Sequence, residues 1–214
     1  MKKLFLFLLC LTALTNSAIL YSGNHNSHKI TLDSSVFNGN SVPFLPFREP
    51  GPFGRALLMN IPFKPVNKVF KQIKKSLGFT NFSNRGEAHI TVITPIEYFK
   101  VLYPRVTINE IDILARRYKI QKSSFTIPVL GSGKKVIDNK LEQTFFLVVK
   151  SKALLNLRKK INEYFIAQGG NPGFFKPERY YPHITVGFTK RDLHASDGVI
   201  KDIYTKDPRF KLIH

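Results

Sequence analysis

The feature that most constrains this chain is a repeated four-residue word, His-Ile-Thr-Val, which occurs at His89–Val92 and again at His183–Val186. Each copy ends a stretch whose hydrophobic pattern predicts a strand, a helix and a second strand. These elements are expected over 55–63, 65–77 and 88–94 in the first unit and over 144–149, 151–168 and 181–188 in the second. Because the repeat occurs only twice, it predicts two similar lobes that face each other, and not a solenoid.

Local signals place further elements around these units. Ser151 precedes an apolar helical pattern and predicts the N-cap of the second unit's helix. Between the units, Thr107 and Glu110 have the spacing of a capping box, which predicts another helix. The sequence Gly131-Ser132-Gly133 separates two apolar stretches and predicts the turn of a β-hairpin.

The first residues are expected to be a secretory signal peptide, residues 1–18. They combine a positive start, an apolar run from Leu4 to Leu14 and a plausible cleavage site after Ala18. This run is shorter than the about 20 residues of a membrane-spanning helix, so we expect no membrane anchor after cleavage. The only cysteine, Cys10, would leave with the peptide, so no disulfide partner is expected. The predicted location is secreted or extracellular, or periplasmic or in the ER lumen, depending on the host.

The rest of the chain divides by composition into three parts. Residues 19–54 are rich in Asn, Ser, Gly and Pro and predict an irregular lead-in. Residues 55–190 hold both units and predict one domain of two lobes, which we expect to be a monomer. Residues 191–214 show no clear periodicity and predict a tail with one short helix.

The charge of the chain indicates an anionic partner. Lys and Arg number 33 against 14 Asp and Glu, which gives a net charge of +19. Such an excess favours binding to nucleic acid or to another acidic surface, although charge by itself speaks only to non-specific binding. Hydrophobic residues make up 43% of the chain and the mean hydropathy is -0.11, which excludes a wholly disordered chain and a multi-span membrane protein.

The pattern His-x-Ser/Thr alone is weak, because it also occurs at His25 and His194 in aperiodic sequence. The two inner copies differ, since each lies in a predicted strand. Side chains alternate faces along a strand, so His89 and Thr91 share one face, and His183 and Thr185 repeat that arrangement. Each of these strands therefore offers an imidazole and a hydroxyl on one face, while the Ile and Val residues anchor the other face in the core.

These pairs suit the cleavage of a phosphodiester. One imidazole can accept a proton from the attacking oxygen while the other donates one to the leaving oxygen, because the unperturbed pKa of histidine is about 6.5. The threonine hydroxyls can donate hydrogen bonds to phosphate oxygens. Histidines in strands also occur for packing reasons, but the identical word at matching places favours function. Two histidines without a third ligand disfavour a zinc site, and no P-loop or nucleophile-elbow motif occurs, so no metal and no cofactor is expected.

The two motifs resemble those of the two-histidine (2H) phosphoesterase superfamily, which includes 2′-5′ RNA ligase-like and cyclic phosphodiesterase proteins. The resemblance rests on Ala88–Val92 and Pro182–Phe188, with Phe145–Val149 similar to the family's strand before the second motif, and it extends from Arg55 to Thr189. It implies an α+β fold that is bilobal and pseudo-symmetric, with two lobes of antiparallel sheet and outer helices around a central cleft. It also implies metal-independent catalysis, with His89 and His183 as the catalytic pair and Thr91 and Thr185 holding the phosphate. The predicted signal peptide departs from the intracellular RNA-processing members.

Residues before the two motifs are candidates for substrate binding. Arg85 precedes the first motif, and Lys176, Arg179 and Tyr181 precede the second. Such side chains can bind phosphates and stack on a base. The alternative, that these loops are solvated and basic with a core tyrosine, is equally compatible with the sequence. The basic runs around Arg158 and Lys74 are more typical of a solvated face than of RNA contacts.

The sequence therefore predicts a secreted phosphodiesterase that acts on RNA or small cyclic nucleotides and oligonucleotides, for example on a 2′,3′-cyclic phosphate or a 2′-5′ linkage. The alternative from another class is a secreted, non-catalytic protein that binds nucleic acid or another polyanion through the same fold. The two intact His-x-Thr faces favour the enzyme, since a binding protein needs neither. A disulfide-stapled ribonuclease is disfavoured by the lack of cysteine.

Overall fold

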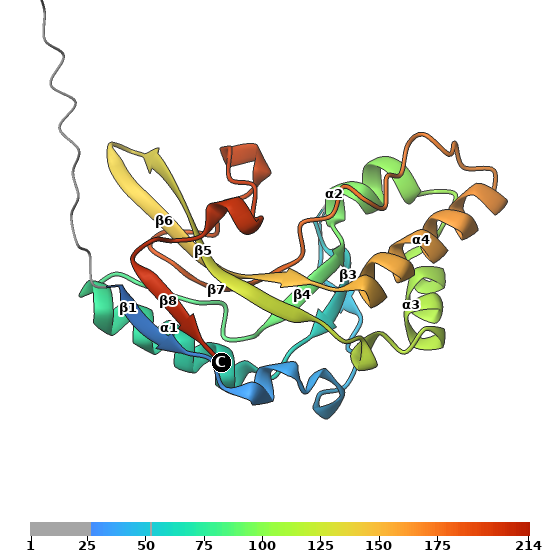
Figure 1. The fold of residues 1–214 in the computed structure, drawn as a ribbon. Helices are drawn as coiled ribbons and strands as arrows, with labels where there is room; N and C mark the ends of the chain where they lie inside the picture. Colours follow the sequence, from blue (N-terminus) through green and yellow to red (C-terminus); the bar gives the residue numbers. More distant parts are fainter. Residues whose placement is uncertain (1–26, 52) are drawn as a thin grey trace, which may run out of the picture.

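The computed structural model of the protein describes residues 27–51 and 53–214. The predicted signal peptide and the first part of the predicted lead-in lie outside these described residues. Within them, no helix combines the length and the apolar character that crossing a membrane requires. Figure 1 shows sheets at the centre of the molecule with helices on the outside.

Two three-stranded antiparallel sheets form the centre of the fold, one from each repeated unit. The first has the order β2-β3-β4 and the second has the order β5-β6-β7, so each motif strand, β4 or β7, lies at the end of its sheet. These strands are β2 (Phe47–Arg48), β3 (Arg55–Asn60), β4 (His89–Ile93), β5 (Thr126–Ile137), β6 (Lys140–Lys150) and β7 (His183–Phe188). The predicted α+β fold with two antiparallel lobes is confirmed.

The main helix of each unit packs against the motif strand of the other unit. Helix α1 (Phe63–Leu77) follows β3 but contacts β7, and α4 (Lys152–Ala167) follows β6 but contacts β4. Figure 1 shows α1 beneath the sheet that contains β7, and α4 on the opposite side, next to β3 and β4. This exchange of helices joins the two lobes, because the main helix of each unit packs on the motif strand of the other unit.

The close approach of α1 to β7 depends on a glycine. A Cβ atom on Gly187 would lie 2.6 Å from Cζ of Phe82 and 2.8 Å from Cδ2 of Phe70, which is on α1. Phe70 and Phe82 stack with ring centroids 4.7 Å apart, directly over this glycine. A larger residue at 187 would push the helix away from the strand.

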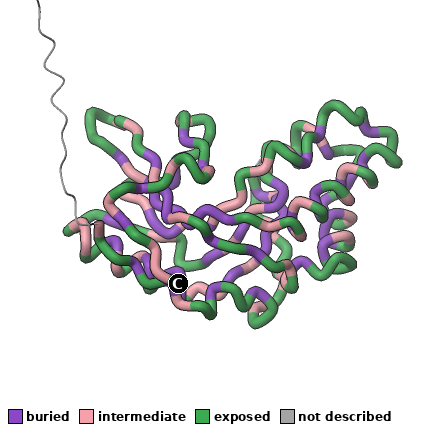
Figure 2. Tube along the Cα trace, in the orientation of Figure 1, coloured by how far each residue is buried: buried purple, intermediate pink, exposed green. Residues whose placement is uncertain are grey.

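The larger of two hydrophobic clusters runs through both lobes. Ile90 of β4 and Ile184 of β7, the second residues of the two repeated words, are fully buried in the same cluster of apolar side chains. In Figure 2 the central strands are largely buried, whereas the outer loops and helix faces are exposed. The remaining helices are short: α2 (Pro95–Glu97) and α3 (Ile108–Arg117), the latter with the predicted Thr107–Glu110 capping box.

The predicted hairpin turn at Gly131-Ser132-Gly133 is wrong. Strand β5 continues through these residues, and the turn lies at Asp138 and Asn139, which both have positive φ. The two glycines are required for packing: a Cβ on Gly131 would lie 2.5 Å from Cε2 of Phe146, and one on Gly133 would lie 2.3 Å from Val199. A glycine that makes room for a neighbour inside a strand has the same sequence signature as one that makes a turn.

The two ends of the chain also differ from the prediction. Within the predicted lead-in, β1 (His28–Thr31) pairs in parallel with β8 (Phe210–Ile213) of the predicted tail. The tail, predicted to hold one short helix, instead forms two 3-10 turns and β8, and it buries Leu193 and Val199 against Phe146. Short strands give a weak periodic signal, and the two partners lie at opposite ends of the chain, so local patterns do not reveal the pair.

Candidate active site

The two repeated words occupy equivalent positions in their sheets. In β4, His89 lies opposite Asn60 and Thr91 lies opposite Leu58, and in β7, His183 and Thr185 lie opposite Val148 and Phe146. Directly after each threonine the register shifts by one residue. The extra residue is the valine of the repeated word in both strands. A bulge of this kind bends a strand and redirects its side chains, and bulges are common next to active sites.

The expected alternation of faces is present in both strands. The His and Thr residues of each word are half-buried, while the Ile and Val residues are buried in the core. Strands β4 and β7 contact each other, and His89 is close enough to lower the pKa of His183. The structure therefore brings the two histidines, 94 positions apart in the chain, to one region between the lobes.

The imidazole of His183 packs beside an aromatic ring, and one positively charged side chain lies nearby. Its Nδ1 is 2.8 Å from the backbone oxygen of Tyr181, and the ring of Phe146 stands edge-on at a centroid distance of 6.0 Å. Burial, followed by the nearby ammonium of Lys201, lowers the pKa of His183 from 6.5 to about 3. A carbonyl oxygen only accepts, so Nδ1 carries the proton and Nε2 of the neutral ring presents a lone pair.

The imidazole of His89 has an acidic partner instead. Its Nδ1 is 2.8 Å from Oε2 of Glu87, and only 15% of the His89 side chain is exposed. Burial raises the pKa of Glu87, but the hydrogen bond and the charge of His89 outweigh this effect, so the net pKa is lowered and the carboxylate is ionised. A carboxylate at Nδ1 orients the ring and stabilises its charged form.

A buried carboxylate from the predicted tail, Asp192, holds the second motif. The hydroxyl of Thr185 donates to Oδ2 of Asp192 at 3.0 Å, and Thr144 on β6 donates to Oδ1 at 2.8 Å. Lys201 and Arg85 also donate to this carboxylate, at 2.7 Å and 3.2 Å. Sequence reasoning missed Asp192 and Lys201, because both lie in aperiodic sequence and only the fold brings them to the motif.

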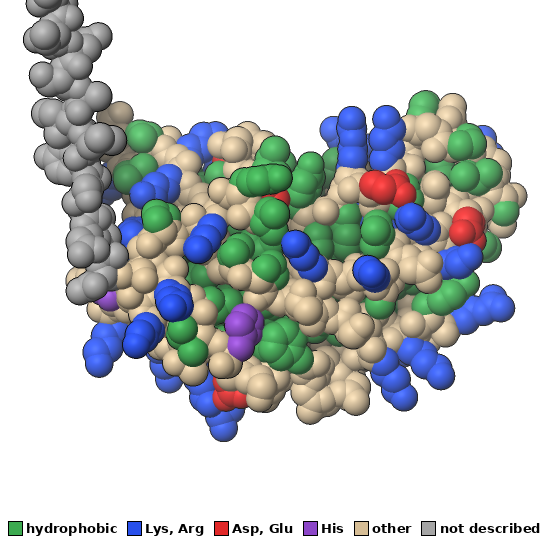
Figure 3. Space-filling model, viewed as in Figure 1, with side chains coloured by type: hydrophobic (Ala, Val, Ile, Leu, Met, Phe, Trp, Pro, Cys, Tyr) green, Lys and Arg blue, Asp and Glu red, His purple; other side chains and the backbone are tan. Residues whose placement is uncertain are grey.

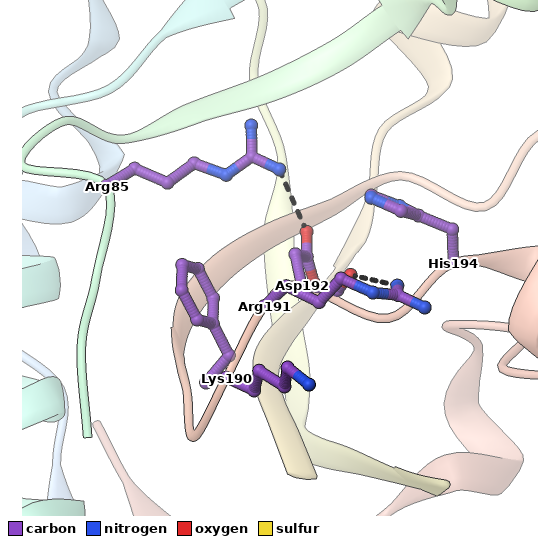
Figure 4. A pocket seen from close by; sticks show the side chains of 6 residues that line it. Arg85, Lys190, Arg191, Asp192 and His194 are labelled. Carbon is purple, nitrogen blue, oxygen red and sulfur yellow. Dashed lines mark hydrogen bonds and ion pairs between the residues drawn. The ribbon is translucent and has the colours of Figure 1, made fainter. Parts of the chain in front are cut away.

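An open pocket of about 510 Å³ adjoins the second motif. Arg85, Lys190, Arg191 and His194 line it together with Phe188 and Asp192, whereas neither motif histidine does. Figure 4 shows Arg85 reaching across from the segment before β4 to Asp192, with His194 on the other side of the carboxylate. The predicted substrate-binding residue Arg85 thus lies in the first unit of the chain, but its side chain is next to the second motif.

The other predicted substrate-binding residues lie in the loop before β7. Lys176 and Arg179 are exposed, and 51% of Tyr181 is exposed. Tyr180 is the core tyrosine of this loop, because its ring packs against Arg158 with a distance of 4.7 Å to the ring centroid. The structure does not place Lys176, Arg179 or Tyr181 in contact with a motif histidine, apart from the carbonyl of Tyr181.

Arg158 corrects the interpretation of its basic run as a solvated face. This α4 side chain is 1% exposed and pairs with Glu97 of α2 at 2.7 Å. It also donates to the backbone oxygens of Val92, at 2.6 Å, and of Pro177, at 2.9 Å. One guanidinium therefore joins the first motif strand to the loop that leads to the second motif.

The surface around the site is basic and concave. Figure 3 shows a hollow in the upper edge of the molecule, above β4 and β7 in the view of Figure 1, with hydrophobic side chains in it and Lys and Arg side chains on its right-hand rim. Among the residues that the structure describes, no group of three or more His, Cys, Asp or Glu side chains is arranged to hold a metal ion.

Comparison with known proteins agrees with this geometry. A family model described as "Swiss Army Knife, 2H phosphoesterase domain" matches residues 56–194, which contain both motifs and Asp192. No curated protein and no solved structure shows significant similarity to the chain.

Proposed function

The chain belongs to the 2H phosphoesterase family, and from this premise we propose that it is a phosphodiesterase of RNA-type or cyclic nucleotide substrates that uses His89 and His183 as its acid–base pair. The observation that carries the proposal is that two identical His-x-Thr faces, one from each lobe, meet where β4 contacts β7. A 2′,3′-cyclic phosphate or a 2′-5′ linkage is a substrate of the required chemistry.

The different surroundings of the two histidines support different roles, with His183 as the base and His89 as the acid. Burial and Lys201 keep His183 neutral, and its Nδ1–H is held by the Tyr181 carbonyl, so its Nε2 can accept the proton of an attacking water. The Glu87 carboxylate stabilises the imidazolium of His89, which can give a proton to the leaving ester oxygen. As the water oxygen bonds to phosphorus, the P–O ester bond breaks, and the product is a phosphomonoester with a free hydroxyl.

Hydroxyl and guanidinium groups are available for the charge that develops on the phosphate. Thr91 shares a face with His89 and can donate to a non-bridging oxygen. Thr185 donates its single proton to Asp192, so it has to turn away from this carboxylate before it can donate to a phosphate. Arg85 shares the same Asp192 oxygen but has further N–H groups that remain available.

The surface of the protein supports a nucleotide as the substrate. The net charge of +19 favours a polyanion, and the pocket lined by Arg85, Lys190 and Arg191 can receive phosphates that flank the reacting one. Exposed Tyr181 directly precedes the second motif strand, and a tyrosine ring can stack on a base. Together with the predicted signal peptide, these features support a phosphodiesterase that acts outside the cytoplasm.

The proposal is tested by incubating the mature protein with 2′,3′-cyclic nucleotides, 2′-5′ and 3′-5′ oligoadenylates and cyclic dinucleotides, followed by chromatography of the products. Turnover is expected for at least one class, to persist in EDTA, and to be lost in His183→Ala. Tight binding of RNA without turnover of any substrate would instead support the non-catalytic binding protein. Activity that EDTA abolishes and zinc or manganese restores would contradict the two-imidazole mechanism.

A further inference from the structure

The segment that follows the second motif contributes a buried ion pair to the site. Nζ of Lys201 lies 2.7 Å from Oδ1 of Asp192, and the side chains are only 3% and 4% exposed. Removing two charges from water is costly and is offset only when the geometry is good and the remaining hydrogen-bonding capacity is used. The other hydrogen-bond partners of Asp192 and the neighbours of Lys201 therefore indicate the role of this ion pair.

Asp192 uses both of its oxygens on groups that belong to the site. Oδ1 accepts from Lys201 and from Thr144 on β6, and Oδ2 accepts from Thr185 and from Arg85. Thr185 is the hydroxyl of the second repeated word, and Arg85 comes from the segment before the first. The carboxylate thus fixes one residue from each motif region, with Lys201 balancing its charge.

Lys201 and the second imidazole both lie against the ring of Phe146. Nζ of Lys201 lies 5.4 Å from the centroid of the Phe146 ring, and the same ring packs edge-on against His183. The charged or titratable groups that act on His183 are Lys201 and Asp192 from the tail and His89 from β4. Lys201 and His89 oppose a positive charge on His183, while Asp192 favours it.

We infer that Asp192 and Lys201 are positioning residues of the reaction: Asp192 fixes the hydroxyl of Thr185, and Lys201 keeps the imidazole of His183 uncharged and ready to accept a proton. This inference rests on the proposed function, because it assigns roles within that reaction. It makes the tail from 191 onward a part of the site, with both residues acting through other side chains.

The direct test is an NMR titration of the His183 imidazole, assigned by comparison with His183→Gln. In the unmodified protein the ring is expected to stay neutral down to about pH 4, because burial and Lys201 lower its pKa to about 3. Lys201→Met removes the opposing charge and leaves Asp192 unbalanced, so the midpoint is expected to rise by about one pH unit or more. Asp192→Asn should not raise it, and Lys201→Arg should behave as the unmodified protein.

Asp207→Asn is the matched control. Asp207 is also a buried carboxylate of the tail, with a side chain that is 1% exposed, and it pairs with Arg209 at 2.6 Å. Its loss should destabilise the tail without moving the His183 midpoint. A midpoint that is unchanged in folded Lys201→Met, or that moves equally in Asp207→Asn, would overturn the inference.

Activity measurements give a second, separable readout. In Lys201→Met the acidic limb of the kcat/KM profile should move to higher pH by the same amount as the NMR midpoint, while kcat/KM at neutral pH changes little because the ring stays neutral there. In Asp192→Asn, kcat/KM should fall at every pH, because Arg85 and Thr185 both lose the carboxylate that orients them. A shifted NMR midpoint in a protein that turns over no substrate would contradict the proposed function and leave the charge relation between Lys201 and His183 intact.

Should Lys201→Met fail to fold, the double variant Asp192→Asn/Lys201→Met replaces it, since it buries no unpaired charge. Its His183 midpoint should still rise, by a smaller amount, because the effect of Lys201 on His183 exceeds that of Asp192. A midpoint in the folded double variant equal to that of the unmodified protein would overturn the inference as well.

Discussion

The two copies of His-Ile-Thr-Val share a strand position, an alternation of faces and a bulge after the threonine, yet their histidines have opposite surroundings. His89 faces the ionised carboxylate of Glu87. His183 faces a backbone carbonyl, an aromatic ring and, behind that ring, the ammonium of Lys201. Two chemically equal side chains thus have different partners at Nδ1, a carboxylate for His89 and a carbonyl for His183, which suits a reaction that needs one acid and one base.

The two junctions between the lobes, α1 with β7 and α4 with β4, differ in the polarity of their contacts. Where α1 meets β7, the contact is apolar and close, with Phe70 packed over Gly187. Where α4 meets β4, the contact is polar, with Arg158 bonded to the Val92 carbonyl and to Glu97. The apolar junction depends on shape, whereas the polar one depends on completing every hydrogen bond of a buried charge.

The largest expected effect tests whether the two histidines act as a unit. His89→Ala and His183→Ala should each lower kcat/KM by about 10²–10⁴-fold, because either loss breaks the same proton-transfer step. The double variant should be far less than multiplicatively worse, since groups that act together are strongly non-additive. Circular dichroism should show all three proteins folded. Multiplicative losses would mean that the histidines act in separate steps.

The polar junction predicts a large loss of stability. Arg158→Met leaves Glu97 and the backbone carbonyls without their partner, so the free energy of unfolding in urea should fall by about 3–5 kcal/mol. The matched control is the neighbour Lys159→Met, which removes a pair with Glu178 whose side chains are 49% and 66% exposed. That change should cost less than about 1 kcal/mol. Equal effects of the two substitutions would contradict a structural role for the buried guanidinium.

The two threonines should differ by a smaller amount. Thr91→Ala should lower kcat by about 10²-fold, the scale of a lost oxyanion donor. Thr185→Ala should cost less than this, because the Thr185 hydroxyl gives up its bond to Asp192 before it can donate to the phosphate. Thr→Ser at each position keeps the hydroxyl and should retain most of the activity. A greater loss in Thr185→Ala than in Thr91→Ala would reverse the proposed order.

The smallest expected effects concern the pH profile of the reaction and Glu87, the acidic partner of His89. The acidic limb of the kcat/KM profile should lie well below the usual histidine range, since burial and Lys201 lower the pKa of His183 to about 3. Glu87→Gln should lower kcat/KM by up to about tenfold without moving this limb, because the His89 ring loses the carboxylate that orients it at Nδ1. Movement of the acidic limb instead would assign the roles of acid and base the other way round.

Much of the scaffold was predictable from local sequence. Strand alternation and helix caps act within a few residues, so the motif strands, the Ser151 cap and the Thr107 capping box follow from patterns that the chain carries locally. The repetition of a four-residue word was enough to select His89, Thr91, His183 and Thr185 as candidate site residues and to predict two facing lobes. The same patterns failed at Gly131, where a strand glycine that makes room for Phe146 resembles a turn.

The sequence by itself determined the two His-x-Thr faces, the chemistry they can perform and the excess of positive charge. Only the tertiary structure decided that each helix covers the motif strand of the other unit, that Arg158 is buried, and that Asp192 and Lys201 complete the second motif. These contacts join residues far apart in the chain, such as Arg85 and Asp192, which are 107 positions apart. Periodicity specifies which face of an element is buried, but not which element buries it, and so the contacts of Asp192 with Arg85 and Thr144 had to come from packing.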